Sequence, residues 1–179
     1  SRFHEVMRIW RRLVALPLMS AVNGQVSKMD RASHLRSNQI TLDQLWAKAK
    51  IVHFSDGRLA VSADATELRF LSATEIAVLI KNGEFKVGEK YFLGLDQLDN
   101  EPYFAWSSDH PQSQSDDAPA GYTTLREIGG DLDEMQMELA LHSVALSNWH
   151  NTHPHCARCG APTSVAMGGA VRTCDADKS

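Results

Sequence analysis

Hydrophobic residues recur at helical spacing near the start of the chain and again near its end. Glu5–Leu16 carries an apolar stripe on one side and arginines on the other, and Pro17 ends the predicted helix. A second, long helix is expected after Asp131, which can cap its first turn. Its apolar positions share one face: Leu132, Met135, Leu139, Leu146 and Trp149.

The segment between these helices contains shorter elements of both kinds. Thr41 is the candidate N-cap of a short helix, and Ser72 with Glu75 forms a capping box before another, which Gly83 can end. An Asp-Gly turn at residues 56 and 57 predicts a hairpin. The predicted strands are Lys50–Phe54, Arg58–Val61, Leu68–Leu71, Lys90–Leu95 and Pro102–Trp106, and Asp109–Pro119 is a polar loop.

Composition and charge are those of a soluble protein and limit the function classes. The chain has 179 residues, of which 43% are hydrophobic and 22% charged, with a net charge of -4. The first fifty residues hold nine Lys or Arg against three Asp or Glu, which is mild evidence for an anionic partner. No apolar run reaches the ~20 residues that a membrane span needs. We therefore expect no membrane partner and a cytoplasmic location.

The three cysteines lie within the last 24 residues and are the strongest chemical signal. Cys156 and Cys159 are separated by two residues, and Gly160 lets the backbone bend beneath them. Because zinc favours four tetrahedral ligands, Cys174 is expected to be the third and Asp177 a weaker fourth. His153 or His155 is an alternative fourth ligand. A ribbon that has lost its metal and a redox-active thiol pair remain open as well.

These patterns together predict an α+β fold. We expect a mixed N-terminal domain with a small antiparallel sheet and flanking helices, followed by a long helix and a zinc ribbon. The expected boundaries are residues 1–124 for the domain, 125–152 for the connecting helix and 153–179 for the ribbon.

Several segments resemble the NADH pyrophosphatase family of Nudix hydrolases, in particular its actinobacterial-type members. The resemblance is dense from Leu125 to Thr163 and looser before it. It is carried by Leu125-Arg126-Glu127, by Ala140-Leu141-His142-Ser143-Val144-Ala145-Leu146-Ser147-Asn148-Trp149-His150, by Thr152-His153-Pro154-His155-Cys156-Ala157-Arg158-Cys159-Gly160-Ala161-Pro162-Thr163, and upstream by Leu16-Pro17-Leu18, Asp30-Arg31-Ala32-Ser33-His34-Leu35-Arg36 and Leu45-Trp46-Ala47.

The resemblance implies the activity of a longer parent enzyme. In that family an N-terminal Nudix-like domain and a zinc ribbon precede a catalytic Nudix domain, which cleaves NAD(H) to the mononucleotide and AMP and can remove NAD caps from RNA. Such enzymes are homodimers that use magnesium or manganese. Carried over by position, the three cysteines are zinc ligands and Arg126 binds substrate. Asp177 replaces a fourth cysteine, and Gly169 stands where some members carry an acidic residue that contacts substrate.

The residues themselves predict that this chain is inactive alone. Pyrophosphate hydrolysis of this kind needs a helix with several glutamates to hold divalent cations. Arg126-Glu127-Ile128 begins like the Nudix box, but Gly129-Gly130-Asp131 follows where paired glutamates are required. We therefore expect the catalytic domain to be absent from this chain. The competing hypothesis is a free-standing zinc-ribbon module that binds nucleic acid through its basic N-terminal residues.

Overall fold

The computed structural model describes residues 27–109 and 119–178. The predicted helix at Glu5–Leu16 and the interior of the polar loop, residues 110–118, lie outside the described residues. The helices and strands, in chain order, are β1 (Met29–Asp30), η1 (Ser33–Leu35), α2 (Gln39–Trp46), β2 (Lys50–Ser55), β3 (Arg58–Ala60), β4 (Phe70–Leu71), α3 (Ala73–Lys81), β5 (Glu89–Asp96), β6 (Pro102–Ser107), β7 (Tyr122–Thr123), α4 (Leu125–Ile128), α5 (Glu134–Thr152), β8 (Ser164–Ala166), η2 (Met167–Gly169) and β9 (Val171–Thr173).

A seven-stranded sheet forms the centre of the molecule, and the α+β class is confirmed. Its strand order is β1-β5-β6-β2-β3-β7, with β4 paired to β2, and β8 and β9 form a separate two-stranded hairpin. The sheet is larger than the small antiparallel one expected, and it is mixed, because β2 and β6 pair in parallel. The chain between these strands passes through β3, β4, α3 and β5, so β6 enters the sheet from the same end as β2.

Two local sequence signals are confirmed. Asp56 and Gly57 connect β2 to β3, and both have positive φ, 48° and 80°, as the two-residue type I′ hairpin turn requires. Ser72 accepts a hydrogen bond from the N–H of Glu75, whose carboxylate accepts one from the N–H of Ser72. This capping box starts α3 where the sequence predicted it.

Two helices start at a different cap from the one predicted. The N-cap of α2 is Asn38, whose side chain accepts the N–H of Thr41, so Thr41 lies inside the helix. The N-cap of α5 is Asp133, two residues after Asp131, and it accepts the N–H of Gln136. In both places two residues able to cap a helix lie within three positions of each other, and the packing of the helix on the sheet selects one of them.

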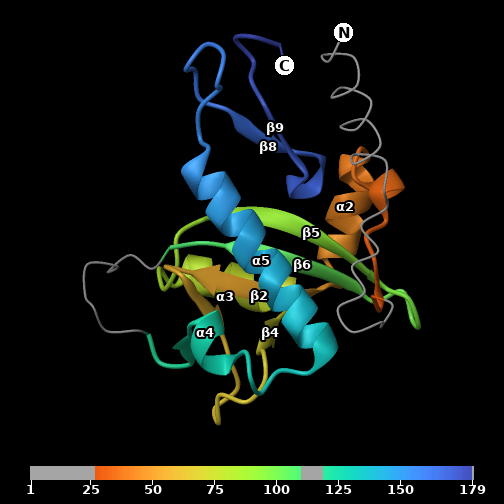
Figure 1. Ribbon diagram of the computed structural model, residues 1–179, viewed down its shortest axis with the longest axis vertical. Helices are drawn as coiled ribbons and strands as arrows, with labels where there is room; N and C mark the ends of the chain where they lie inside the picture. Colours follow the sequence, from red (N-terminus) through yellow and green to blue (C-terminus); the bar gives the residue numbers. More distant parts are fainter. Residues whose placement is uncertain (1–26, 110–118, 179) are drawn as a thin grey trace, which may run out of the picture.

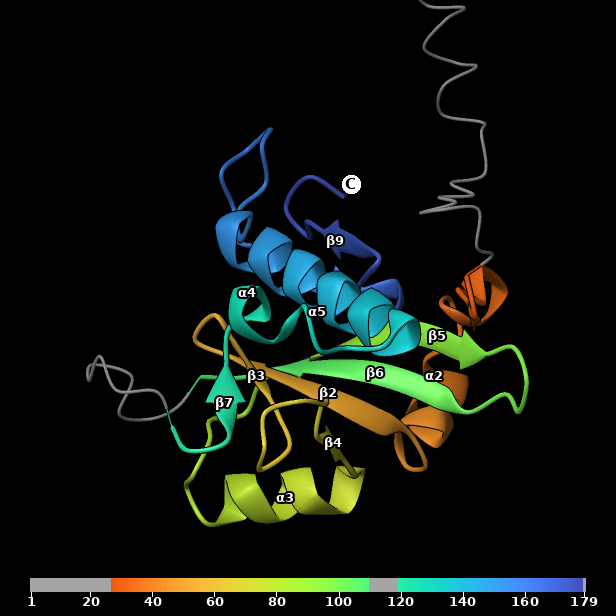
Figure 2. The same cartoon turned by 60° about the horizontal axis from the view of Figure 1, so that its bottom comes forward.

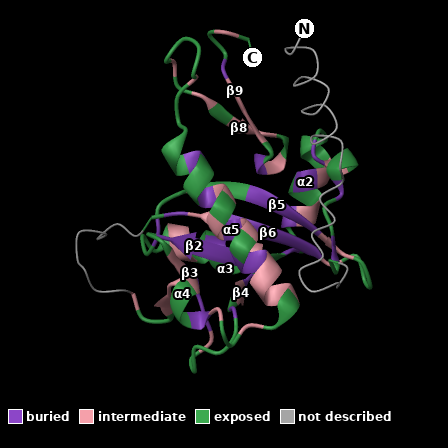
Figure 3. Ribbon diagram, viewed as in Figure 1, coloured by how far each residue is buried: buried purple, intermediate pink, exposed green. Residues whose placement is uncertain are grey.

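The sheet is covered on both faces, and this explains why its central strands are almost entirely buried. Figures 1 and 2 show α5 across one face and α3 beneath the other, and Figure 3 shows the buried band between them. Alternating side chains of β2 serve the two cores: Val52 and Phe54 pack on the α5 side, and Ile51 packs on the side of α2 and α3. Each core contains several large apolar side chains, which is what a covered face requires.

The buried face of α5 differs from the apolar stripe that the sequence predicted. Leu139 is buried, and Leu132, Met135 and Leu146 pack against the same core, but Trp149 remains 37% exposed. The buried residues of α5 instead run along one side of the helix from Leu139 through Ser143 and Ser147 to His150, at helical spacing. We call this row the buried line of α5. Two small serines let the helix approach the sheet closely, and His150 occupies the end of the line.

No helix within the described ranges, 27–109 and 119–178, is long and apolar enough to span a bilayer.

Candidate metal centre

Three cysteine sulfurs come together at the end of α5. Cys156 and Cys159 lie in the turn that follows the helix, and the β8–β9 hairpin carries Cys174 back to them. The three Sγ atoms lie within 4.8 Å of one another, and the Cys159 and Cys174 sulfurs are 3.5 Å apart. Four sulfurs at ~2.3 Å from a tetrahedral zinc ion would be about 3.8 Å apart. The spacing therefore fits a metal ion bound by three thiolates.

The turn that carries the first two cysteines has the conformation predicted from its sequence. The N–H of Gly160 donates to the carbonyl of Cys156 at 2.9 Å, and the N–H of Cys156 donates to the carbonyl of Ala161 at 2.8 Å. Gly160 has a φ of 75°, a conformation that glycine adopts without strain. Hydrogen bonds from the backbone of Cys159 and Arg158 lower the pKa of the Cys156 thiol to about 7. A lowered pKa favours the thiolate, which is the form that binds metals.

The expected fourth ligand has a different contact in the structure. The Asp177 N–H donates to the Cys174 sulfur at 3.4 Å, while its carboxylate oxygen Oδ2 lies 3.2 Å from the Arg158 guanidinium. Within the described ranges, the group of side chains close enough to share one ion consists of the three thiols, without Asp177, His153 or His155. Asp177 as a ligand therefore stays a prediction.

A buried histidine joins α5 to the β8–β9 hairpin, and the sequence analysis did not single it out. The His150 Nε2 atom lies 2.9 Å from the Gly169 carbonyl, and Nδ1 lies 3.0 Å from an Arg172 guanidinium nitrogen. Since Arg172 can only donate, Nδ1 accepts and Nε2–H donates. The imidazole also stacks on Tyr91 of β5 at 4.5 Å and 13°. Burial lowers the pKa of His150, which favours this neutral form.

Two arginines complete the junction between the hairpin and the sheet. Arg172 donates to the hydroxyl and the carbonyl of Thr163, at 2.6 and 2.7 Å, and so ties β9 to the segment before β8. Arg36 donates to the Gly168 carbonyl at 3.3 Å and lies 5.1 Å from the ring centre of Phe92. His150 and Arg36 both lie in segments that carry the family resemblance, which was the available signal for them.

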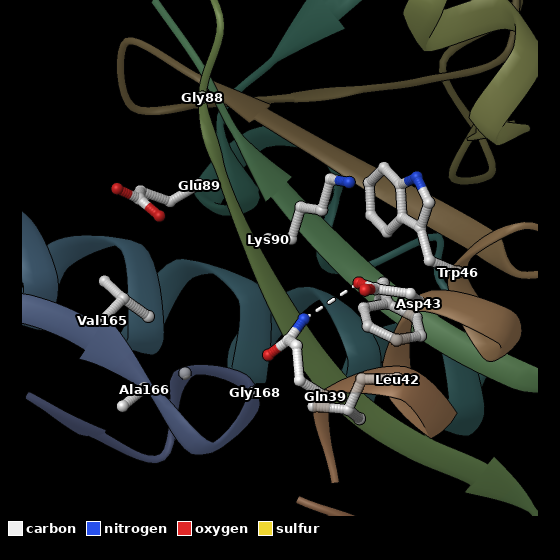
Figure 4. Close-up of a pocket in the computed structure, with 12 residues that line it drawn as sticks. Gln39, Leu42, Asp43, Trp46, Gly88, Glu89, Lys90, Val165, Ala166 and Gly168 are labelled. Carbon is white, nitrogen blue, oxygen red and sulfur yellow. Dashed lines mark hydrogen bonds between the residues drawn. The ribbon is translucent and has the colours of Figure 1, made fainter.

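A cavity of about 300 Å³ lies along this junction (Figure 4). It is lined by α2, by the start of β5 and by the segment from Val165 to Gly169. Gln39 donates to the Asp43 carboxylate at 2.9 Å, and the Lys90 ammonium lies 4.4 Å from the Trp46 ring centre. These polar groups are thus engaged with neighbouring residues. The cavity therefore lies at the interface between α2, β5 and the β8–β9 hairpin.

The structure does not bring Arg126 to the cysteines. Arg126 is exposed on α4, and Figure 1 shows α4 and the β8–β9 hairpin toward opposite ends of the molecule. The neighbouring Glu127 accepts hydrogen bonds from the hydroxyls of Thr123 and Thr124 and from the N–H of Thr124. These bonds lower the pKa of Glu127 to about 2. Glu127 therefore caps a short helix, as expected for a coincidental match to the Nudix box.

The comparison with protein families is consistent with this arrangement of sheet, long helix and cysteine turn. Residues 48–149, more than half of the chain, match the NADH pyrophosphatase-like rudimentary NUDIX domain. The chain belongs to this family. The matched segment begins just before β2 and ends in the last turn of α5. The cysteine turn follows α5 and lies outside the matched segment. None of the curated proteins compared with the chain matches it.

Proposed function

We propose that this chain forms the accessory part of a Nudix hydrolase that cleaves the pyrophosphate of NAD(H) to the mononucleotide and AMP. The match of residues 48–149 to the NADH pyrophosphatase-like domain carries this proposal. NAD-capped RNA is proposed as a second substrate of the parent enzyme. Arg126, exposed on α4, remains the proposed contact of this chain with the substrate.

The proposed role of the described residues is structural support. The three thiolates fit a zinc ion, and such an ion would hold the cysteine turn to the β8–β9 hairpin. His150 and Arg36 then connect this small unit to the sheet. The parent enzyme would use magnesium or manganese in a catalytic domain, because these cations need oxygen ligands that the thiol cluster does not offer.

This proposal is tested by assaying the 179-residue chain for NADH hydrolysis with magnesium or manganese. We expect no AMP above the blank, because the metal-binding group found within the described ranges consists of thiols, not carboxylates. The control is the same assay after an additional purification step, which removes contaminating hydrolase. AMP release that depends on the metal and persists through this step would contradict the proposed accessory role.

We also propose that the chain forms homodimers through its N-terminal region. The motivation is the apolar stripe of Glu5–Leu16, which needs a surface to pack against. Light scattering at concentrations on the order of tens of micromolar should give the mass of a dimer. A monomer mass would contradict the proposal. Removing residues 1–26 provides the control, because the truncated chain should then be monomeric.

A further inference from the structure

The charge pair between Arg158 and Asp177 joins the two parts of the cysteine cluster. Arg158 lies between Cys156 and Cys159, and Asp177 follows Cys174 by three residues. Their side chains meet at 3.2 Å, and the Asp177 N–H donates to the Cys174 sulfur. Asp177 therefore stands at the sequence position where a fourth ligand would be expected, but its carboxylate contacts Arg158 of the opposite turn.

We propose that Asp177 clamps the two cysteine turns together and does not coordinate the metal, so that the fourth coordination position accepts a small external thiol. The proposal rests on the zinc site of the proposed function. In the absence of a thiol, water would take the position. A thiol that binds there displaces the water and releases its proton to solvent, and its sulfur forms the new bond to the metal.

The exposure of the cluster supports access for such a ligand. Cys174 is buried, Cys156 is half-buried and Cys159 is exposed, so the cluster reaches the protein surface at Cys159. The His153 Nδ1 atom lies 3.0 Å from the Trp149 carbonyl and 2.9 Å from the Thr152 hydroxyl, so this edge of the ring faces the end of α5. Within the described ranges, neither histidine nor Asp177 belongs to the group of ligand atoms close enough to share one ion, which leaves the fourth place to an external ligand.

The donor set explains why a thiol is the preferred class. Three thiolates make the site soft, and soft sulfur ligands suit zinc and its analogue cobalt(II). With a fourth thiolate the site would reach the charge of an ordinary four-cysteine zinc site, which is common in proteins. An outer hydrogen bond from the Asp177 N–H to the Cys174 sulfur stabilises the negative charge that accumulates there.

The test uses the full chain loaded with cobalt(II) under anaerobic conditions, with a phosphine reductant in place of thiols. 2-Mercaptoethanol is then titrated while the absorption spectrum is recorded. The sulfur-to-cobalt charge-transfer band should grow by about a third and saturate, because three thiolates become four in a four-coordinate site. Asp177→Cys is the positive control and should show the stronger band without added thiol.

Variants separate the clamp from a ligand role. Asp177→Asn should leave the cobalt spectrum and the thiol response unchanged, while metal loss to a chelator accelerates by less than about tenfold, since a partly exposed ion pair contributes little. Asp175→Asn is the matched control for a neighbouring exposed carboxylate and should change neither the spectrum nor the rate. A spectrum that changes in Asp177→Asn before thiol is added would show that Asp177 is a ligand and overturn the inference.

Two further outcomes distinguish this inference from the zinc site itself. If cobalt binds but 2-mercaptoethanol leaves the band unchanged, the fourth position is already filled by the protein and only the external-ligand inference fails. If the chain takes up neither cobalt nor zinc, the metal site of the proposed function fails, and the inference fails with it.

Discussion

Replacing Gly169 by alanine tests how closely the β8–β9 hairpin packs on the sheet. Gly169 has a φ of 88°, and a Cβ atom built on it would lie 2.7 Å from the Cδ1 atom and 3.1 Å from the Cβ atom of Tyr91. Tyr91 is almost fully buried in β5 and stacks on His150, so it has little freedom to move away. The substitution therefore combines backbone strain with overpacking.

The structure sets the magnitude of this effect. Alanine in the left-handed region costs about 1–2 kcal/mol, and overpacking a close-packed contact adds about 1–3 kcal/mol. We expect Gly169→Ala to lower the free energy of unfolding by about 2–5 kcal/mol in total. Gly83→Ala is the matched control, because Gly83 has a φ of 74° but a Cβ atom there meets nothing within 4 Å. It should cost about 1–2 kcal/mol through strain alone.

Urea unfolding followed by tryptophan fluorescence measures both losses, and hydrogen exchange locates them. If the hairpin undocks instead of straining the whole fold, amides of residues 164–173 should exchange faster in Gly169→Ala and be unchanged in Gly83→Ala. Equal losses for the two variants, together with unchanged exchange in the hairpin, would refute the close approach to Tyr91.

Three further predictions concern buried or metal-binding groups. Because burial lowers the pKa of His53 to about 3 from 6.5, the unfolded chain binds a proton that the folded chain does not. Below about pH 6.5, His53 alone should therefore lower the free energy of unfolding by roughly 1.4 kcal/mol per pH unit. Urea midpoints at pH 7 and 5 should show a smaller fall for His53→Gln. His150→Phe keeps the ring on Tyr91 but loses both hydrogen bonds, so urea unfolding should show a loss of about 1–3 kcal/mol; no loss would contradict the junction. Cys156→Ser should abolish zinc retention, whereas wild-type protein holding less than about a tenth of an equivalent by elemental analysis would contradict a metal site.

Local signals in the sequence predicted the elements well because their causes are local. The turn at Asp56-Gly57 and the capping box at Ser72 each depend on a few neighbouring residues, and both are present. The strands near these turns also lie close to their predicted positions, because a short apolar run forms a strand wherever the sheet is covered on both faces. The N-cap of α5 is Asp133, two residues after the predicted Asp131. Both aspartates are able to cap a helix, and the packing of α5 on the sheet decides which one does.

The cysteine site was predicted in part for the same reason. The spacing of Cys156 and Cys159 and the glycine after them define a turn, and the turn is present. The sequence also named Cys174 as the third ligand, but the β8–β9 pairing that brings it to the other two was not predicted. The contact of Asp177 with Arg158 could not be foreseen, since a carboxylate at this position is equally able to face a metal or a guanidinium.

The sequence by itself determined the family, the class of fold and the three thiols that can share an ion, because these depend on residue types and on spacings within short segments. Only the tertiary structure decided that Ser143, Ser147 and His150 form the buried line of α5, because small polar side chains do not register in an apolar pattern. It also decided that β2 and β6 run in parallel and that His150 bonds to Gly169 across the junction. Such contacts join residues far apart in the chain, and their energies depend on the packing of several elements at once, so the spacing of residues along the sequence cannot encode them.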